Sequence, residues 1–243
     1  MTARAGVRVQ TVDAADIGTV AADAVLAALP VDNPRLGVAT GETPRPLYAE
    51  LARRCDCDEA DLTATTLVAL DEYVGIGPSD PRSYGYYVRT LIAEPLCAAG
   101  VILPDGGAAD PGREAVRFEE AIVSAGGVDV QIAGIGANGH LAFNEPGSAF
   151  DSTSRVVSLT EQTRRDNARF FDRPEDVPAS AITQGLGTIS RARSVVLLAR
   201  GSRKAGALAA MLHGPVSAAV PASILRTHPA VTVIADKAAA AQL

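Results

Sequence analysis

The chain has 243 residues, of which 47% are hydrophobic and 21% are charged, and its formal net charge is −6. This length permits one large core, and the balance of residues excludes a disordered protein. The negative charge argues against a nucleic-acid partner. No apolar run reaches the ~20 residues of a membrane-spanning helix, and no signal peptide precedes the strand-like segment at residue 7, so we expect a cytoplasmic protein without a membrane partner.

Strand-like and helix-like segments alternate along the chain. Apolar, β-branched stretches predict strands at residues 7–12, 35–40, 65–70, 101–103, 128–133, 194–199 and 231–235. Helical spacing and capping residues predict helices at residues 13–29, from 43 onward, and at 83–96, 113–125, 160–171 and 202–212. This alternation predicts an α/β fold with a single doubly wound, mostly parallel sheet and helices on both faces, as in Rossmann-like proteins.

No internal repeat or linker divides the sequence, so residues 1–243 are predicted to form one domain. The predicted helix at 160–171 is polar and its apolar spacing is weak, which is typical of a surface or lid helix. We therefore expect a mobile lid around residues 158–180. The alanine-rich tail at 238–241 is expected to fray.

The most informative segment is the glycine-rich run at residues 134–147, directly after a predicted strand. It contains Asn138, His140 and Glu145. In open α/β sheets the ligand crevice lies outside the carboxyl ends of the strands. A histidine and a carboxylate on a glycine-permitted loop at that place can transfer protons. The segment therefore predicts an enzyme.

A metal site is the alternative interpretation of His140, and the sequence does not favour it. One histidine with scattered carboxylates makes a poor ligand set for a transition metal. Two of the three cysteines are separated by a single residue, which is too close for the usual zinc half-site, so the cysteines are interpreted as structural. We expect neither a metal nor an organic cofactor.

Two further strand ends carry candidate anion-binding residues. Thr40, Gly41, Glu42 and Thr43 form a turn into a predicted helix with Thr43 as its N-cap, where free backbone N–H groups favour a phosphate. An ordinary capped turn is the alternative. Lys204 begins another predicted helix and is one of only two lysines among 22 basic residues. A lysine so placed indicates a need for a compact ammonium group, although a solvent-facing residue is the alternative.

Adjacent carboxylates, Asp71 and Glu72, follow the strand predicted at residues 65–70. Neighbouring side chains in extended backbone point to opposite faces, so at most one of them faces the crevice. A solvated loop acid is the alternative for either residue.

Several segments of the sequence together resemble the glucosamine-6-phosphate deaminase family. They are residues 40–44 (TGETP), 70–75 (LDEYVG), 83–84 (SY), 134–147 (GIGANGHLAFNEPG), 167–171 (NARFF) and 201–205 (GSRKA). They occur in the family's order from about residue 36 to residue 236. The segment from Asn138 to Gly147 is highly specific, whereas the turn at 40–44 is shared by several sugar-phosphate enzymes.

The resemblance implies a hydrolase that converts the amino-sugar phosphate D-glucosamine 6-phosphate and water into D-fructose 6-phosphate and ammonium. It implies that His140 opens the sugar ring, with Asn138 and Glu145 orienting and tuning it. It also implies that Asp71 moves a proton from C2 to C1 through an enolamine. The phosphate is expected on the turn at residues 40–43, on Lys204 and on Arg169 of the lid.

Two positions depart from the family pattern. Many relatives have an aspartate where this chain has Asn138, and an amide can orient a histidine but carries no charge. Glu42 stands in the phosphate turn where glycine or serine is common, so its carboxylate must point away from the phosphate or weaken binding.

The resemblance also bears on assembly. Hexameric relatives bind the activator N-acetylglucosamine 6-phosphate between subunits, at positions that match Ser148, Arg155 and Val157. Val157 replaces a lysine, and the chain lacks the longer C-terminal extension of those relatives. A monomer or small homo-oligomer is therefore expected rather than a hexamer.

Two alternative functions share the expected fold. One is a 6-phosphogluconolactonase, which has a similar phosphate turn and a glycine–histidine loop. The sequence after His140, and Tyr73 where a lactonase has arginine, favour the deaminase. The other is a sugar-phosphate-sensing regulator, for whose DNA-binding segment the chain has no room before Val7.

Overall fold

A seven-stranded parallel sheet forms the centre of the protein, whose computed structural model describes residues 6–243. The order across the sheet is β1 (Val7–Val12), β10 (Val231–Asp236), β9 (Ser194–Ala199), β6 (Val130–Gly134), β2 (Arg35–Val38), β3 (Thr66–Ala69) and β5 (Gly100–Ile102). The predicted doubly wound sheet is confirmed. The chain adds β3 and β5 on one side of β2, but β6, β9 and β10 on the other. A crevice is expected at the carboxyl ends of β2 and β6, where the order reverses.

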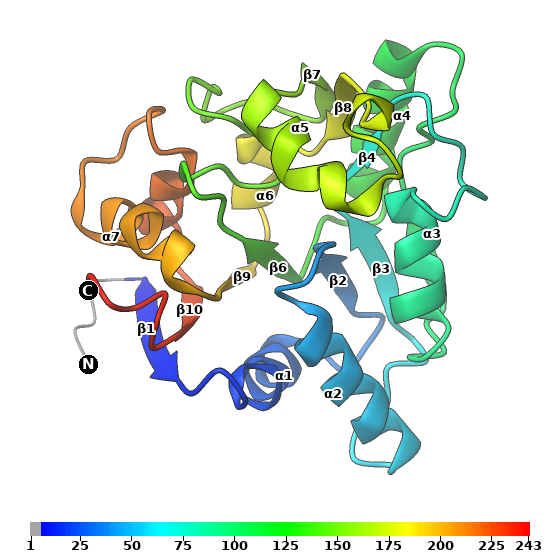
Figure 1. Cartoon of the computed structure of the whole chain (residues 1–243). Coiled ribbons are helices and arrows are strands. Elements are labelled where there is room, and N and C mark those ends of the chain that lie inside the picture. The colour runs from blue at the N-terminus through cyan, green and yellow to red at the C-terminus, as the bar shows by residue number, and fades with distance from the viewer. Residues whose placement is uncertain (1–5) are drawn as a thin grey trace.

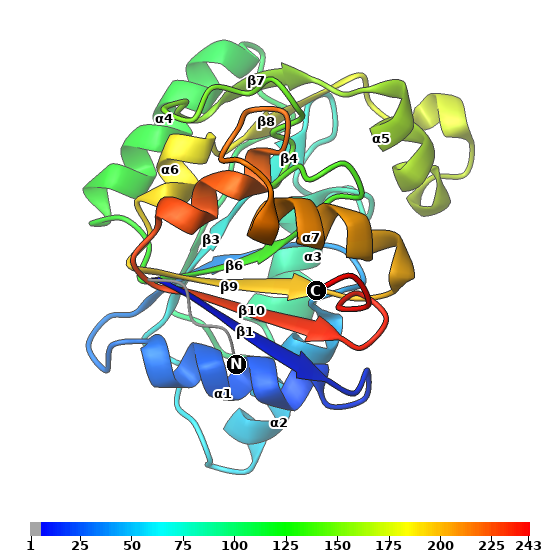
Figure 2. The ribbon, with the colours of Figure 1, turned by 90° about the vertical axis from the view of Figure 1, so that its left-hand side faces the viewer.

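Helices cover both faces of this sheet (Figures 1 and 2). On one face lie α1 (Ile17–Ala28) and α2 (Arg45–Asp56), and on the other lie α6 (Leu186–Ser190) and α7 (Ala205–His213). The remaining helical segments are α3 (Tyr84–Val88), the π-helix η1 (Arg89–Ala93), α4 (Pro111–Ser124), α5 (Glu161–Asn167) and the 3₁₀ helices η2 (Ala168–Phe170), η3 (Pro174–Asp176), η4 (Ser202–Lys204) and η5 (Pro221–Thr227). Across residues 6–243, no helix combines the length and apolarity needed to cross a membrane.

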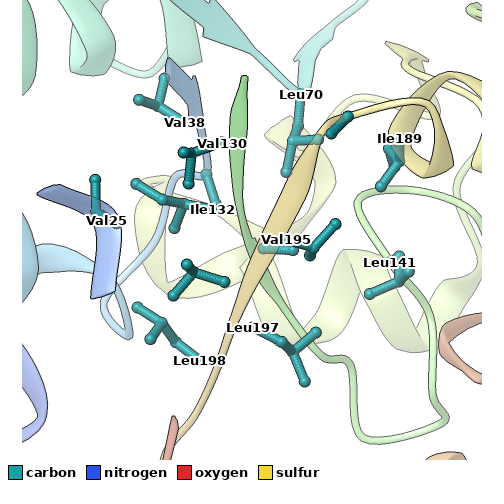
Figure 3. Close-up of a cluster of buried hydrophobic side chains, with 14 of the residues drawn as sticks. Val25, Val38, Leu70, Val130, Ile132, Leu141, Ile189, Val195, Leu197 and Leu198 are labelled. Carbon is teal, nitrogen blue, oxygen red and sulfur yellow. The ribbon is translucent and has the colours of Figure 1, made fainter. Parts of the chain in front are cut away.

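The main core lies between these helices and the sheet, and Figure 3 shows part of it. Because both faces of a parallel sheet are covered, its strands read as continuous apolar runs. Ile132 on β6 and Leu197 on β9 are both fully buried. The same cluster includes Leu141, which lies in the loop that follows β6. The core therefore anchors the loop that carries the predicted catalytic histidine.

A second, smaller sheet was not predicted. It is antiparallel, in the order β4 (Asp71–Tyr73), β8 (Ser180–Thr183) and β7 (Arg155–Ser158). Each strand has only three or four residues, which is too short for an alternating pattern to be recognised. One residue, Leu70, separates β3 from β4, so the chain passes directly from the main sheet into the small one.

The expected lid corresponds to the excursion of the chain between β7 and β8. The paired residues Ser158 and Ser180 close its base, and it contains α5, η2 and η3. A small separate core fixes the excursion in this structure, through contacts among Tyr73, Ile76, Phe143, Leu159, Phe171, Val177 and Ala181. The lid's mobility and the limits of the domain stay predictions.

Two local expectations were wrong. The N-cap of α2 is Pro44 rather than Thr43, and no side chain caps this helix. The alanine-rich tail does not fray, because Ala239 is fully buried and its backbone N–H donates to Asp236 Oδ1 at 2.7 Å. Apolar contacts with the core decide the position of the tail, and low complexity alone gave no sign of them.

Candidate active site

The segments predicted to carry chemistry meet at one edge of the main sheet. The loops after β2 and β6 leave neighbouring strands at the point where the strand order reverses. β3 lies beside β2, and β9 lies beside β6, so Asp71 and the turn at residues 200–204 leave the same edge. In Figure 2 the arrowheads of β1, β9 and β10 point toward the side on which α5 lies. This edge therefore gathers the residues that the sequence had separated.

The backbone after β6 is shaped to hold the imidazole of His140. The N–H of Gly136 donates to the carbonyl of His140 at 2.9 Å, and the N–H of Gly139 donates to the carbonyl of Gly136 at 3.0 Å. Gly139 has a φ of +84°, which favours glycine. A Cβ on Gly136 would lie 2.4 Å from the His140 ring. Only glycine leaves room for the imidazole at that position.

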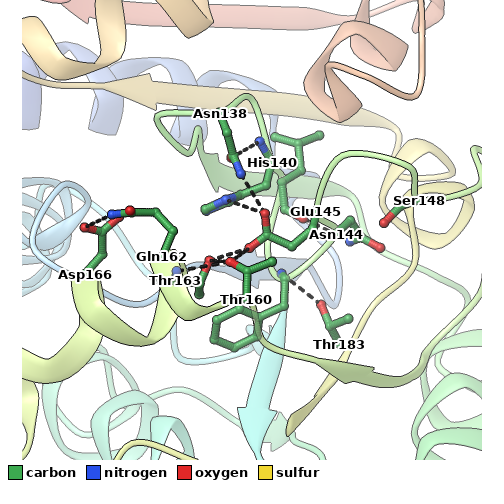
Figure 4. A network of polar contacts seen from close by, with 12 residues as sticks. Asn138, His140, Asn144, Glu145, Ser148, Thr160, Gln162, Thr163, Asp166 and Thr183 are labelled. Carbon is green, nitrogen blue, oxygen red and sulfur yellow. Dashed lines mark hydrogen bonds and ion pairs between the residues drawn. The ribbon is translucent and has the colours of Figure 1, made fainter. Parts of the chain in front are cut away.

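Asn138, His140 and Glu145 form a hydrogen-bonded network, shown in Figure 4. The amide of Asn138 donates to Glu145 Oε2 at 2.7 Å, and its oxygen accepts from the backbone N–H of His140 at 3.2 Å. Glu145 Oε2 also lies 3.7 Å from Nδ1 of His140. Asn138 thus contacts the histidine backbone and the glutamate in place of the ring. Its influence on the imidazole passes through Glu145.

The carboxylate of Glu145 is held in its charged form. Burial opposes its ionisation, but contacts from His140, Thr163 and Asn138 outweigh burial and lower its pKa to about 2. Its Oε1 accepts a hydrogen bond from the hydroxyl of Thr163 and another, at 3.3 Å, from Thr160. Both threonines belong to the start of the lid, so the loop after β6 and the lid share one carboxylate.

Asp71 and Glu72 are both buried, but they differ in their hydrogen bonds. The side chain of Asp71 forms no hydrogen bond within residues 6–243. It is 7% exposed. Burial, assisted by the nearby charge of Glu72, raises the pKa of Asp71 to about 8. A carboxyl with a raised pKa at the end of a sheet strand is a candidate general base.

Glu72 has a different role from its neighbour. Its carboxylate accepts backbone N–H groups from Tyr73 at 2.8 Å, Tyr84 at 3.0 Å and Gly85 at 2.7 Å, and so connects β4 to the start of α3. Burial nevertheless raises its pKa to about 7, because the three hydrogen bonds compensate only partly. The expectation that at most one carboxylate of the pair faces the site agrees with this division.

The turn after β2 is suited to an anion. Gly41 has a φ of +93°, and no side chain caps the N-terminus of α2, so the turn and the first helical N–H groups lack a protein acceptor in the described part of the chain. The carboxylate of Glu42 pairs with Arg45 at 3.1 Å, which partly compensates its charge. The hydroxyl of Tyr84 interacts with the side chain of Thr40, which links this turn to α3.

Arg169 and Lys204, from the lid and from η4, come close enough to interact electrostatically. Burial lowers the pKa of Lys204, and the charges of Arg203 and Arg169 lower it further while Asp166 opposes them. Neither Arg169 nor Lys204 forms an ion pair with a residue between 6 and 243. Two cations that approach each other, and that form no ion pair within residues 6–243, favour an anionic ligand.

Sequence reasoning missed the contacts that join the lid to the rest of the site. Besides the threonines on Glu145, Asn167 of α5 interacts with the hydroxyl of Tyr73, which lies 3.1 Å from that of Tyr84. Thr160 is a typical N-cap residue and predicts a helix start, but nothing in the sequence connects it or Thr163 to Glu145. For metals, residues 6–243 contain no group of three or more histidine, cysteine, aspartate or glutamate side chains placed to hold an ion.

Comparisons with known proteins point to a single family. A family model described as glucosamine-6-phosphate isomerases/6-phosphogluconolactonase matches residues 13–234. The chain is 51% identical over 230 residues to a glucosamine-6-phosphate deaminase of Cutibacterium acnes, and 49% identical over 230 residues to one of an Arthrobacter species. Both alignments cover 93% of this chain and 88% of the relative.

Solved structures show the same relationship. A monomeric glucosamine-6-phosphate deaminase superposes with a TM-score of 0.93 and 36% identity, over 98% of this chain and 100% of that one. A 6-phosphogluconolactonase from Trypanosoma brucei has a TM-score of 0.80 and 18% identity over the whole of both chains, and so shows the common fold alone.

Proposed function

Because the chain belongs to the glucosamine-6-phosphate isomerase/6-phosphogluconolactonase family, we propose that it converts D-glucosamine 6-phosphate and water into D-fructose 6-phosphate and ammonium. One observation carries this proposal. Asp71, a buried carboxyl without a side-chain hydrogen bond within residues 6–243, and the His140–Glu145 pair are found at the same edge of the main sheet. Ring opening needs a proton donor and isomerisation needs a base, and these groups can supply both.

His140 acts first, on the closed sugar ring. Its side chain is 25% exposed, so one face of the imidazole is open to a ligand while Glu145 lies beside Nδ1. As the bond between the ring oxygen and C1 breaks, His140 gives a proton to that oxygen, and the neutral imidazole then takes up the proton of the C1 hydroxyl, which leaves an open-chain aldehyde. Glu145 is charged at neutral pH and lies beside the imidazole during this transfer.

Asp71 acts next, on the open chain. The ionised carboxylate removes the proton from C2 while a proton passes from the substrate's ammonium group to O1, which gives an enolamine. Asp71 then returns its proton at C1, and a protonated imine remains at C2. Water adds to that imine carbon, and ammonia leaves from the resulting carbinolamine. The nearby amino group of the substrate, when protonated, favours the ionised form of Asp71, whose pKa burial holds at about 8 in the free protein.

The phosphate is bound away from the reacting carbons, by the turn at residues 40–43 together with Arg169 and Lys204. This assignment is supported by the unpaired cations and by the uncapped start of α2. Binding energy from a remote phosphate can orient C1 and C2 against the catalytic groups. Arg169 belongs to the lid, so the same contact is expected to hold the lid closed.

The reaction class inferred from the sequence needs correction. The class of hydrolase is not supported, because the relatives of 49–51% identity are named deaminases and the matched family is described as glucosamine-6-phosphate isomerases/6-phosphogluconolactonase. The chemistry agrees with isomerase/deaminase, since hydrogen moves between two carbons before the C–N bond breaks. The solved structures named 6-phosphogluconolactonase are 17–22% identical to this chain and share the fold alone.

The assembly proposed here is a monomer or small homo-oligomer, located in the cytoplasm. The main support for the assembly is the likeness to a deaminase described as monomeric, which the present chain covers completely. The replacement of a lysine by Val157 at the matching activator position agrees with it.

A coupled assay of ammonium release tests the proposed reaction. Glucosamine 6-phosphate, galactosamine 6-phosphate and N-acetylglucosamine 6-phosphate are compared, with 6-phosphogluconolactone as a separate substrate. We expect ammonium and fructose 6-phosphate from glucosamine 6-phosphate, and none from the N-acetylated sugar, whose nitrogen is an amide. Hydrolysis of the lactone without any ammonium release would overturn the proposal.

A further inference from the structure

Thr163 of α5 is the lid residue that reaches into the catalytic network. It is 5% exposed, and its hydroxyl donates to Oε1 of Glu145. Its backbone N–H donates to the hydroxyl of Thr160, the N-cap of the same helix, at 3.1 Å. The hydroxyl of Thr163 also accepts from the hydroxyl of Thr160, at 3.1 Å, and it is the group of Thr163 that contacts Glu145.

The two oxygens of Glu145 divide their partners between two elements. Oε2 faces the catalytic loop, where it accepts from Asn138 and lies 3.7 Å from Nδ1 of His140. Oε1 faces the lid, where its partners are Thr163 and Thr160. Figure 4 shows the carboxylate between these two groups. A rotation that released Oε1 from the lid would also move Oε2 relative to the imidazole, since both oxygens belong to one planar group.

From this geometry we propose that Thr163 is a positioning residue, which couples docking of the lid to the orientation of His140 through Glu145. The inference rests on the proposed function, because it assigns Thr163 to the ring-opening step. A docked lid supplies the Thr163 hydroxyl and fixes Glu145 in the rotamer that supports an imidazolium. An undocked lid leaves Oε1 to water, and the carboxylate is then free to turn away from His140.

The substitution Thr163→Val tests the coupling, because valine keeps the shape and the backbone N–H of threonine and removes only the hydroxyl. Loss of a hydrogen bond to a charged group is expected to lower kcat about tenfold or more with glucosamine 6-phosphate. The Kd of an open-chain analogue, a 2-amino-2-deoxyhexitol 6-phosphate, is expected to stay within about twofold, since it needs no ring opening. Thr163→Ser restores the hydroxyl and is expected to recover most of kcat.

Gln162→Ala is the matched control. Gln162 precedes Thr163 on α5, is exposed, and bonds only to Asp166, at 3.0 Å, among the residues that the structure describes. Its kinetics are expected to match those of the unsubstituted protein. Thr163→Ala serves as the second variant if the valine protein does not fold, which thermal unfolding reveals.

Three results would overturn the inference. They are an unchanged kcat in Thr163→Val, a loss of analogue binding in proportion to the loss of kcat, or a serine variant as impaired as the valine variant. The second of these would make Thr163 a purely structural lid residue. An unsubstituted protein that releases no ammonium from glucosamine 6-phosphate would instead contradict the proposed function, and the inference with it.

Discussion

The imidazole Nδ1 of His140 lies 3.7 Å from Oε2 of Glu145, which is close enough for an ion pair but too long for a hydrogen bond. Nδ1 is buried and has no hydrogen-bond partner in the described part of the chain. Catalytic hydrogen bonds are often long without a ligand and shorten when the substrate binds. We therefore expect the distance between Nδ1 and Oε2 to shorten to a hydrogen bond when the substrate binds.

This relationship predicts that His140→Gln impairs ring opening more than binding. Glutamine cannot donate a proton as an acid, so turnover of the closed-ring substrate is expected to fall by about two powers of ten or more. The open-chain analogue is expected to bind with a similar Kd, measured by calorimetry. Equal losses for both ligands would make His140 a structural residue.

Because Asp71 is a buried carboxyl, its replacement by asparagine is expected to lower activity without lowering the stability of the fold. Asp71→Asn is expected to lower kcat by about two to four powers of ten and to abolish deuterium incorporation at C1 of fructose 6-phosphate. Because the folded-state pKa of Asp71 is about 8, above the usual value, the parent loses stability as pH rises from about 4 to about 8. The variant is therefore expected to be the more stable protein at pH 8, measured by urea unfolding. A large loss of stability in the variant would contradict this account.

The same pKa predicts how activity depends on pH. A general base acts when deprotonated, so kcat/KM is expected to increase as pH rises toward about 8 and the Asp71 carboxyl ionises in the free protein. Glu72, with a pKa raised to about 7, is expected to broaden this rise, because the two carboxyls lie side by side. A kcat/KM that is constant between pH 6 and 8 would argue against Asp71 as the base.

Because Arg169 lies close to Lys204, we predict that Arg169 is the lid residue that binds the phosphate. Arg169→Ala is expected to raise KM about tenfold or more, through the loss of a charge-assisted hydrogen bond. Arg165→Ala is the control, because Arg165 lies on the same lid, is 67% exposed and, among residues 6–243, forms an ion pair only with Glu161, at 3.8 Å. Similar effects of both substitutions would indicate a general effect of lid charge rather than a specific contact.

The cavity beside the loop after β6 predicts that N-acetylglucosamine 6-phosphate does not activate the protein. It measures about 390 Å³, and its lining includes Ser148, Arg155 and Val157. Arg155 donates to Asn144 Oδ1 at 2.8 Å and to Ser148 Oγ at 3.3 Å, so part of its hydrogen-bonding capacity is already used. Val157 offers no cation where the resemblance implies a lysine, and the charge-assisted contact that it cannot make is worth ~1.5–3 kcal/mol. We expect hyperbolic kinetics that N-acetylglucosamine 6-phosphate does not change, and a monomer or small oligomer in sedimentation. A hexamer with sigmoidal kinetics relieved by that sugar would contradict this prediction.

The sequence by itself determined the main sheet, its helices and the identity of the candidate groups. Parallel strands buried on both faces are continuous apolar runs, so β6 and β9 could be recognised without any knowledge of their neighbours. Glycine-rich turns after such strands locate the edge where a ligand binds, which led to His140 and to the turn at residues 40–43. These signals are local, and they need only a few adjacent residues to be read.

Only the tertiary structure decided how those groups interact. The strands β4, β7 and β8 are stabilised by pairing with one another, across separations of up to 112 residues between Asp71 and Thr183, and short strands of this kind have no pattern of their own. The division of roles between Asp71 and Glu72 followed from where α3 begins. The bond from Thr163 to Glu145 depends on how the lid docks, and docking is set by a separate small core around Tyr73, Phe143 and Phe171. Contacts between distant segments result from packing of the whole chain, which no local pattern encodes.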